Sequence, residues 1–185
     1  MKLRRVCVLC GAAAGAAPGF AQAAAALGRL LAEGGREVVY GGSSSGCMGA
    51  LADAALAVGG RVTGVVPRQL ISNERPHQRL TDLEITEDLA SRKLRMFARS
   101  DAIIALPGGT GTLDELLEAL TMKRLGYLGH PIAVVSVLHF YDPFVTLLAR
   151  CIDEGFADRT QRGLFDVLQG IDTVGHWLES VPESA

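Results

Sequence analysis

The fold class is decided by residues 102–115, which read AIIALPGGTGTLDE. Its first five residues are apolar and carry no charge, which predicts a buried strand at residues 102–106. Pro107 and three glycines follow, and a segment with leucines at helical spacing begins at Thr112. A strand, a glycine-rich turn and a helix in this order are typical of a parallel α/β sheet with a ligand site at the turn.

The same alternation continues along the rest of the chain. Further strands are expected at residues 5–9, 37–40, 61–66 and 132–137. Helices are expected at residues 18–33, 47–58, 89–99, 112–124 and 142–154, and a long loop at residues 72–81. Continuous apolar strands between helices imply right-handed βαβ crossovers. We therefore expect a Rossmann-like, doubly wound parallel sheet in a three-layer α/β/α arrangement, with residues 1–185 as a single domain.

Composition excludes several classes of protein. Apolar residues make up 49% of the 185 residues and the net charge is −2, so the chain forms a core and has no large basic field for nucleic acid. No apolar run reaches the roughly 18 residues of a membrane helix, so no membrane partner is expected. Ala21-Gln22-Ala23 resembles a signal-peptidase site, but glycines and Pro18 interrupt the apolar stretch before it, which favours a cytoplasmic protein.

The cysteines and histidines do not form a metal-binding pattern. Cys7 and Cys10 form a C-x-x-C, but they lie in the apolar run Val6-Cys7-Val8-Leu9-Cys10, which reads as a buried strand, and residues three apart in a strand point to opposite faces of the sheet. Buried structural thiols are expected instead, and neither a metal nor a cofactor is expected. The histidines, which have no ligand spacing, are expected on the surface or in loops: His77, His130, His139 and His176.

Three glycine-rich turns follow predicted strands. Residues 11–15 (GAAAG) lack the G-x-G-x-x-G pattern, which disfavours an NAD-type module, and they are either a tight turn or a ligand contact. Residues 41–46 (GGSSSG) precede Cys47-Met48 where a P-loop needs Lys-Ser/Thr, so NTP hydrolysis is excluded and anion binding remains. Residues 107–112 form the third turn, where Thr112 is expected to cap the helix with Glu115 at the capping-box position.

Charged side chains accompany the third turn. Arg92, Arg95 and Arg99 fall on one face of the preceding helix, and a cation beside the glycine loop would complete a phosphate site. Glu115 is either a structural cap or a catalytic carboxylate on this pattern alone.

Arg92-Lys93 followed by P-G-G-x-G-T-x-x-E at residues 107–115 resembles the "Lonely guy" (LOG) family. The resemblance extends over nearly the whole chain. The family consists of cytokinin riboside 5′-monophosphate phosphoribohydrolases that are often labelled lysine decarboxylases. Pyridoxal phosphate chemistry requires a Schiff-base lysine, and none of Lys2, Lys93 and Lys123 has a recognisable cofactor setting, so we reject the decarboxylase label.

The resemblance implies hydrolysis of the N-glycosidic bond of a nucleoside 5′-monophosphate, by a homodimer, with no metal or cofactor. Arg92 and Glu115 match the family's catalytic pair, and Glu115 would stabilise an oxocarbenium-like sugar or activate water. The positions that match substrate contacts are Gly42, Ser43, Glu74, Lys93, Gly108, Gly109, Thr110, Gly111, Thr112 and Thr121.

The chain departs from the family pattern around the expected pocket. Ala12 and Ala13 replace serines, Ser43 replaces a glycine, Leu89-Ala90 replaces Met-His, and Thr110 replaces an aromatic residue. The preferred base is therefore left open between plain adenine, an N6-prenylated adenine and another base. The alternative to the hydrolase is a non-catalytic nucleotide- or phosphate-binding protein of the same fold.

Overall fold

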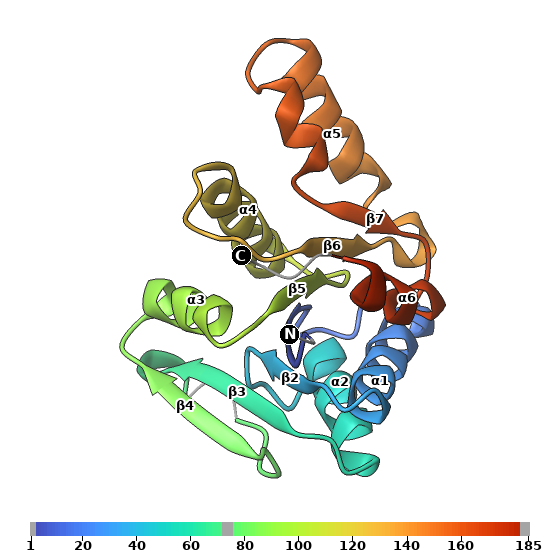
Figure 1. Cartoon of the computed structure of the whole chain (residues 1–185). Helices are drawn as coiled ribbons and strands as arrows, with labels where there is room; N and C mark the ends of the chain where they lie inside the picture. Colours follow the sequence, from blue (N-terminus) through green and yellow to red (C-terminus); the bar gives the residue numbers. More distant parts are fainter. Residues whose placement is uncertain (1–2, 72–75, 182–185) are drawn as a thin grey trace.

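A computed structural model describes residues 3–71 and 76–181, and all elements named below lie within these ranges. Among the described residues, seven parallel strands form one sheet of order β4-β3-β2-β1-β5-β6-β7 (Figure 1). The strands are β1 (Arg5–Leu9), β2 (Glu37–Tyr40), β3 (Val62–Pro67), β4 (Asp82–Thr86), β5 (Ala102–Ala105), β6 (Ile132–Val135) and β7 (Asp166–Leu168). The strand order reverses between β1 and β5, which makes this pair the topological switch point. The expected doubly wound parallel sheet is confirmed.

Helices cover both faces of the sheet, which confirms the three-layer arrangement (Figure 1). They are α1 (Pro18–Glu33), α2 (Gly46–Ala57), α3 (Leu89–Ala98), α4 (Thr110–Arg124), α5 (Asp142–Asp153) and α6 (Asp172–Ser180). One apolar cluster joins the sheet to α1, α2 and α6, and a second joins the opposite face to α3 and α4. The five inner strands β1, β2, β3, β5 and β6 alternate their side chains between the two clusters, so both of their faces are apolar and they read as continuous apolar runs.

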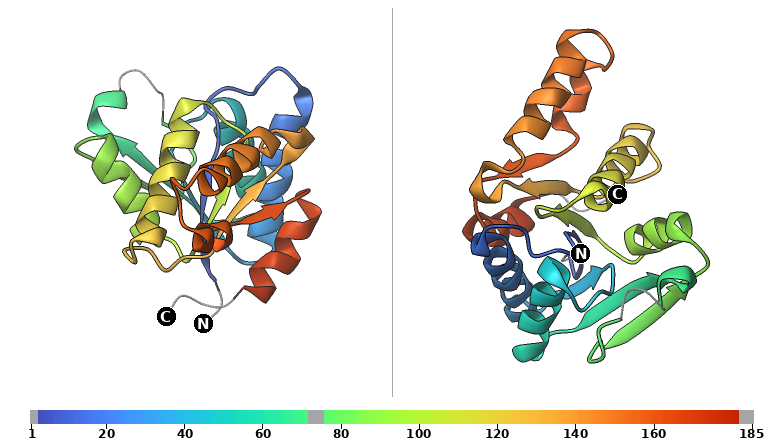
Figure 2. Two further views of the ribbon diagram at one scale, coloured as in Figure 1. Left: turned by 90° about the horizontal axis from the view of Figure 1, so that it is seen from above. Right: turned by 180° about the vertical axis from the view of Figure 1, so that it is seen from behind.

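Helix α5 is the exception to this packing. None of its residues is fully buried, and it projects away from the rest of the molecule in two opposite views (Figures 1 and 2). Its apolar side is therefore only partly covered by this chain.

The edge strands β4 and β7 and helix α6 were not expected from the sequence. In β4, Leu83 and Ile85 are 45% and 50% exposed and alternate with polar residues, so the strand lacks a continuous apolar run. The structure also corrects the start of α4. The helix begins at Thr110 with Gly109 as its N-cap, so the expectation that Thr112 caps it with Glu115 is wrong.

The cysteines lie where the strand geometry places them. Cys7 belongs to the cluster on the α3 and α4 side and Cys10 to the cluster on the α1 side, and both are free and buried. Burial raises the pKa of both thiols well above the ordinary value. His77, expected on the surface or in a loop, lies in the loop before β4 but is buried there. It is 7% exposed, its Nδ1 accepts from the Arg79 amide, and its Nε2 lies 3.2 Å from Asp53.

None of the helices in the described ranges has both the length and the apolar character needed to cross a bilayer.

Candidate functional site

A pocket of about 440 Å³ lies at the switch point, beside the carboxyl ends of β1 and β5. We call it the switch-point pocket. Its wall is formed by the loops after these strands, the first turn of α2 and the start of α4. The side chains and loop residues that line it include Cys10, Phe20, Cys47, Met48, Arg92, Glu115, Phe140 and residues 11–15 and 107–112.

Backbone hydrogen bonds join the two glycine loops of the pocket, residues 11–15 and 107–112, and the strands before them. The Leu106 amide donates to the Leu9 carbonyl at 2.8 Å, and the Gly11 amide donates to the Pro107 carbonyl at 3.3 Å. A Cβ on Gly108 would lie 2.9 Å from the Gly11 nitrogen and would also meet the Thr112 side chain. Glycine is therefore required at Gly108 for the two loops to approach each other this closely.

The start of α4 supplies hydrogen-bond donors to the pocket. The first backbone bond of the helix runs from the Leu113 amide to the Gly109 carbonyl at 3.1 Å. The amides of Thr110, Gly111 and Thr112 precede it and have no acceptor within the helix. A Cβ on Gly109 or Gly111 would meet nothing within 4 Å, so open space lies over this main chain. Free amides and the helix dipole together favour an anionic group here.

Arg92 carries a buried positive charge into the same pocket. Its side chain comes from α3 and the residue is 6% exposed. Nε donates to the Val65 carbonyl and Nη2 to the Gly41 carbonyl, both at 3.1 Å. Among the described residues no carboxylate forms an ion pair with it. A buried guanidinium held only by backbone carbonyls keeps unmatched charge, which an anionic ligand in the pocket would balance.

Glu115 faces the pocket from the second turn of α4. It is also 6% exposed, and none of its side-chain atoms forms a hydrogen bond or ion pair with another described residue. Burial raises the pKa of this carboxyl above its ordinary value, and the Arg92 charge opposes the shift without cancelling it. The buried, unpaired carboxyl and its raised pKa are features of catalytic carboxylates rather than of helix caps.

Several of the predicted site residues lie outside the pocket wall. Lys93 donates from Nζ to Asp114 at 2.8 Å and also pairs with Glu118. Burial lowers the pKa of Lys93, but these hydrogen bonds outweigh it and leave the pKa above its ordinary value. Thr121 is exposed near the far end of α4. Glu74 falls outside the described residues.

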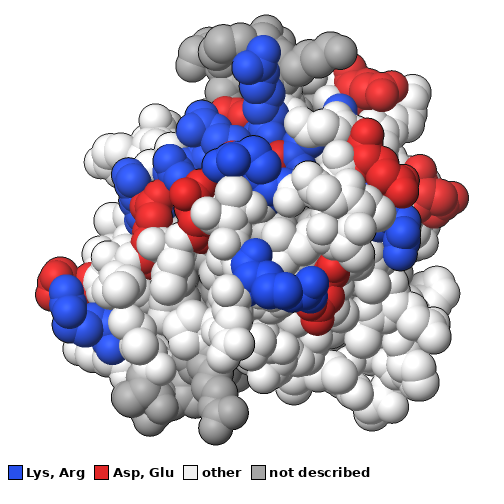
Figure 3. Space-filling model, turned by 90° about the horizontal axis from the view of Figure 1, so that it is seen from below, with Lys and Arg blue, Asp and Glu red and all other residues white. Residues whose placement is uncertain are grey.

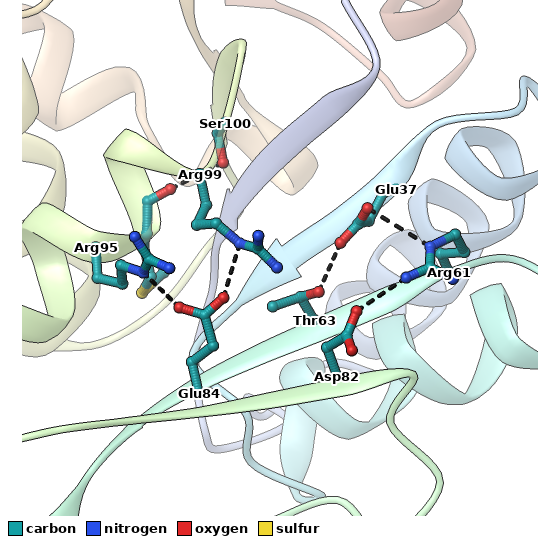
Figure 4. A network of polar contacts seen from close by, with 9 residues as sticks. Glu37, Arg61, Thr63, Asp82, Glu84, Arg95, Arg99 and Ser100 are labelled. Atoms are coloured by element: carbon teal, nitrogen blue, oxygen red, sulfur yellow. Dashed lines mark hydrogen bonds and ion pairs between the residues drawn. The ribbon is translucent and has the colours of Figure 1, made fainter.

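The second glycine loop, residues 41–46, contacts Arg92 of the site. Gly42 and Ser43 do not line the pocket, but the Gly42 carbonyl accepts from the His77 amide and Ser43 Oγ accepts from the Ser45 amide. A Cβ on Gly41 would collide with the guanidinium of Arg92. This loop therefore holds Arg92 in place. Arg95 and Arg99, expected beside the pocket, instead pair with Glu84 of β4 (Figure 4).

Aromatic residues of the pocket escaped the sequence analysis. Phe20 and Phe140 line it and contact each other edge to face, with ring centroids 5.9 Å apart. Phe20 follows the first glycine loop and Phe140 follows β6, so only their place after predicted strands could have indicated them. In the part of the chain that is described, no cluster of His, Cys, Asp and Glu has the makings of a metal site.

Comparison with known proteins relates the chain to a family. A family model described as "Possible lysine decarboxylase" matches residues 48–176. The chain is 38% identical over 183 residues to Cytokinin riboside 5'-monophosphate phosphoribohydrolase LOG of Oryza sativa subsp. japonica, covering 98% of this chain and 76% of that protein. It is also 38% identical over 155 residues to Cytokinin riboside 5'-monophosphate phosphoribohydrolase LOG7 of Arabidopsis thaliana, covering 84% of this chain and 71% of that protein.

Solved structures share the fold at lower sequence identity. The molybdenum cofactor binding protein of Rippkaea orientalis superposes with a TM-score of 0.74 at 20% identity, over 97% of this chain and 98% of that one. The Moco carrier protein of Chlamydomonas reinhardtii gives a TM-score of 0.72 at 21% identity, over 96% of each chain.

Proposed function

Because the chain belongs to the LOG family of cytokinin riboside 5′-monophosphate phosphoribohydrolases, we propose that it hydrolyses the N-glycosidic bond of an adenosine 5′-monophosphate. The products are the free base, plain or N6-modified, and ribose 5-phosphate. The observation that carries the proposal is the placement of a buried arginine and a buried, unpaired carboxyl in one pocket with a helix N-terminus. Residues 1–185 act as a single nucleotide-binding domain in this proposal.

The phosphate binds at the start of α4. The free amides of Thr110, Gly111 and Thr112 donate to its oxygens, and Gly108 and Gly109 let it approach the main chain. The guanidinium of Arg92, held by Gly41 and Val65, adds a fixed positive charge.

Glu115 acts on the sugar. Cleavage of the N-glycosidic bond develops positive charge at the anomeric carbon, as in glycoside hydrolysis. An ionised carboxylate with no other partner stabilises that charge and activates the attacking water. Phe20 and Phe140 form the apolar wall of the pocket that remains for the base or its substituent.

The name "Possible lysine decarboxylase" does not fit the lysines of the chain. Lys93 is engaged by Asp114 and Glu118, and neither Lys93 nor Lys123 lines the switch-point pocket. Lys2 lies outside the described residues. A Schiff base with a cofactor would need a lysine in the pocket.

We also propose a homodimer in the cytoplasm, formed through α4, α5 and the loop after α5. This face carries exposed apolar side chains, among them Leu117, Leu125, Leu147 and Phe156, the last 87% exposed. Together with the partly covered helix α5 they form a surface that a second copy would bury. Light scattering at micromolar concentration should give a dimer mass, and Phe156→Asp should shift it toward the monomer. A monomeric wild type would contradict this proposal.

The catalytic proposal is tested by chromatographic detection of free base. Purified protein is incubated with AMP, isopentenyladenosine monophosphate, GMP, CMP and IMP. Glu115→Gln should lower base release on the order of 100-fold or more, while Asp114→Asn, which changes the neighbouring exposed carboxylate, should retain it. Ligand-dependent thermal stabilisation of wild type without any base release would favour the non-catalytic binding protein instead.

A further inference from the structure

A second cavity, of about 820 Å³, lies at the opposite edge of the sheet from the switch-point pocket. We call it the amino-end cavity, because its lining residues begin or precede β1, β2, β3, β5 and β6. The lining comprises Leu3, Arg4, Arg5, Ala32, Gly35, Arg36, Glu37, Gly59, Gly60, Arg61, Ser100, Asp101 and His130. It shares no residue with the switch-point pocket. Its size lies within the usual range for small-molecule sites.

Positive charge predominates in this lining. Of its four arginines, Arg5 pairs with Asp101 at 3.2 Å. Arg61 pairs with Glu37 at 3.7 Å and with Asp82 at 2.9 Å, as Figure 4 shows. Arg4 and Arg36 have no carboxylate partner within residues 3–71 and 76–181. The molecule also carries a dense group of Lys and Arg side chains on the face shown in Figure 3. The cavity wall therefore has two guanidinium groups in excess.

Two nitrogens in the wall are also unpaired. Nε of Arg36 and Nδ1 of His130 are buried and have no hydrogen-bond partner among the described residues. The other ring nitrogen of His130 is 3.0 Å from the Phe97 carbonyl, so it donates there and the ring is held in place. Both atoms are covered by the chain, so a ligand in the cavity does not reach them directly; the unpaired Nε shows that no acceptor in the described chain holds the Arg36 guanidinium there.

The unmatched arginine is not needed by the helix that ends beside it. The carbonyls of Leu30, Leu31 and Ala32 at the end of α1 accept from the backbone amides of residues 34, 36 and 35. The end of α2 is closed in the same way, by the amides of residues 59 and 60. The backbone thus caps both helix ends, and the Arg36 side chain remains available.

The positioned guanidinium groups favour a phosphate monoester over other anions. Arg61 and Arg5 are each paired with a carboxylate of the lining, while Arg4 and Arg36 have no such partner in the described chain. A phosphate monoester carries about two negative charges, which match the two arginines in excess. Gly35 and Gly59 have open space where a Cβ would stand, and they line the cavity together with the apolar residues Leu3 and Ala32.

We propose that the amino-end cavity is a second binding site, separate from the switch-point pocket, for a small molecule that bears a phosphate monoester. Its ligand reaches the protein from the amino ends of the strands, so it binds without competing for the space around Glu115. The site stands whether or not the chain hydrolyses nucleotides.

The test is a titration with inorganic phosphate, followed by the ¹H–¹⁵N amide signals of the glycines. Signals of Gly35, Gly59 and Gly60 should shift and saturate in wild type. Arg36→Gln should weaken this binding on the order of tenfold, through the lost charge-assisted hydrogen bonds. Arg29→Gln removes an exposed arginine that lines neither cavity, and it should leave the binding unchanged.

Ribose 5-phosphate, titrated in the same way, should bind the amino-end cavity more tightly than inorganic phosphate. Absence of saturable shifts at Gly35, Gly59 and Gly60, or shifts that Arg36→Gln leaves unchanged, would overturn the site. Equal affinity for the two probes would overturn the preference for a monoester. The signals of Gly108, Gly109 and Gly111 report the switch-point pocket separately, so a failure of the proposed function is recognised independently.

Discussion

Arg92 and Glu115 reach one pocket from two different helices, each only 6% exposed, and they do not form an ion pair with each other. Arg92 is held by the carbonyls of Gly41 and Val65, and Glu115 has no partner among the described residues. Direct pairing would neutralise both groups. In the proposed reaction, their separation leaves one charge for the phosphate and the other for the sugar.

The pH dependence of catalysis should follow Glu115. Burial raises the pKa of its carboxyl, and the proposed reaction needs the ionised form. In a plot of kcat/KM against pH, we expect a fall of about tenfold per pH unit at low pH. The pH at which this plot bends should lie above the ordinary glutamate pKa. Initial rates of base release between about pH 4 and 9 would show it. Asp114→Asn removes a nearby negative charge that helps to raise this pKa, so the variant should keep the acid limb and move the bend to lower pH. A wild-type bend at or below the ordinary glutamate value would contradict the role of Glu115.

Glu115 should also lower the stability of the fold near neutral pH. A carboxyl with a raised pKa binds its proton more strongly in the folded state than in the unfolded state. Its favourable contribution is full below the unfolded pKa and is lost as the pH rises through the folded pKa. We expect Glu115→Gln to increase the free energy of unfolding at pH 7 but not near pH 4, measured by urea denaturation. A destabilised variant at pH 7 would show that the carboxylate has a structural partner.

Arg92 should be irreplaceable by lysine. Arg92→Lys keeps the charge but cannot donate to both the Val65 and Gly41 carbonyls from a planar fork. A carbonyl left unpaired in a buried site costs about 1–3 kcal/mol, and the displaced charge should raise KM. Thermal denaturation and substrate titration measure the two effects. Arg95→Lys, on the exposed side of α3, is the matched control, and equal behaviour of the two variants would refute the prediction.

The glycines of the third loop should separate into two classes. Gly108→Ala should destabilise the fold, because its Cβ would press on Gly11 and Thr112. Gly111→Ala meets nothing within 4 Å, so the fold should keep its melting temperature while the affinity for a nucleotide falls. Differential scanning fluorimetry with and without AMP distinguishes the two. Equal loss of stability in both variants would mean that the loop serves packing alone.

The central part of the fold was predictable from the sequence, and its edges were not. β1 and β2 were predicted with their observed boundaries, because both faces of a central strand are apolar and the run stands out. β4 contains Asp82, Glu84 and Thr86 and leaves Leu83 and Ile85 half exposed. Such an edge strand has no apolar run, and only its pairing with β3 makes it a strand.

The site was predicted where one local segment supplies it. The glycine loop and Glu115 are neighbours in sequence, and Arg92 lies on the preceding helix, so the motif and the resemblance identified them. Phe20 and Phe140 are 120 positions apart in the sequence. They come into contact because of the order of the strands in the sheet, which cannot be read from the sequence. The buried position of His77 likewise depends on the Gly42 carbonyl and Asp53, which are remote in sequence.

In the switch-point pocket, main-chain atoms and side chains have different proposed roles. Backbone amides and glycines form the part assigned to the phosphate, and a side-chain substitution other than one to proline leaves a backbone N–H in place. Ala12, Thr110, Phe20 and Phe140 occupy the remaining wall, and none of them donates to or accepts from Arg92 or Glu115. The protein can therefore acquire a new base preference by changing a few side chains while its bond-breaking chemistry stays intact, which makes this wall the place to begin directed evolution.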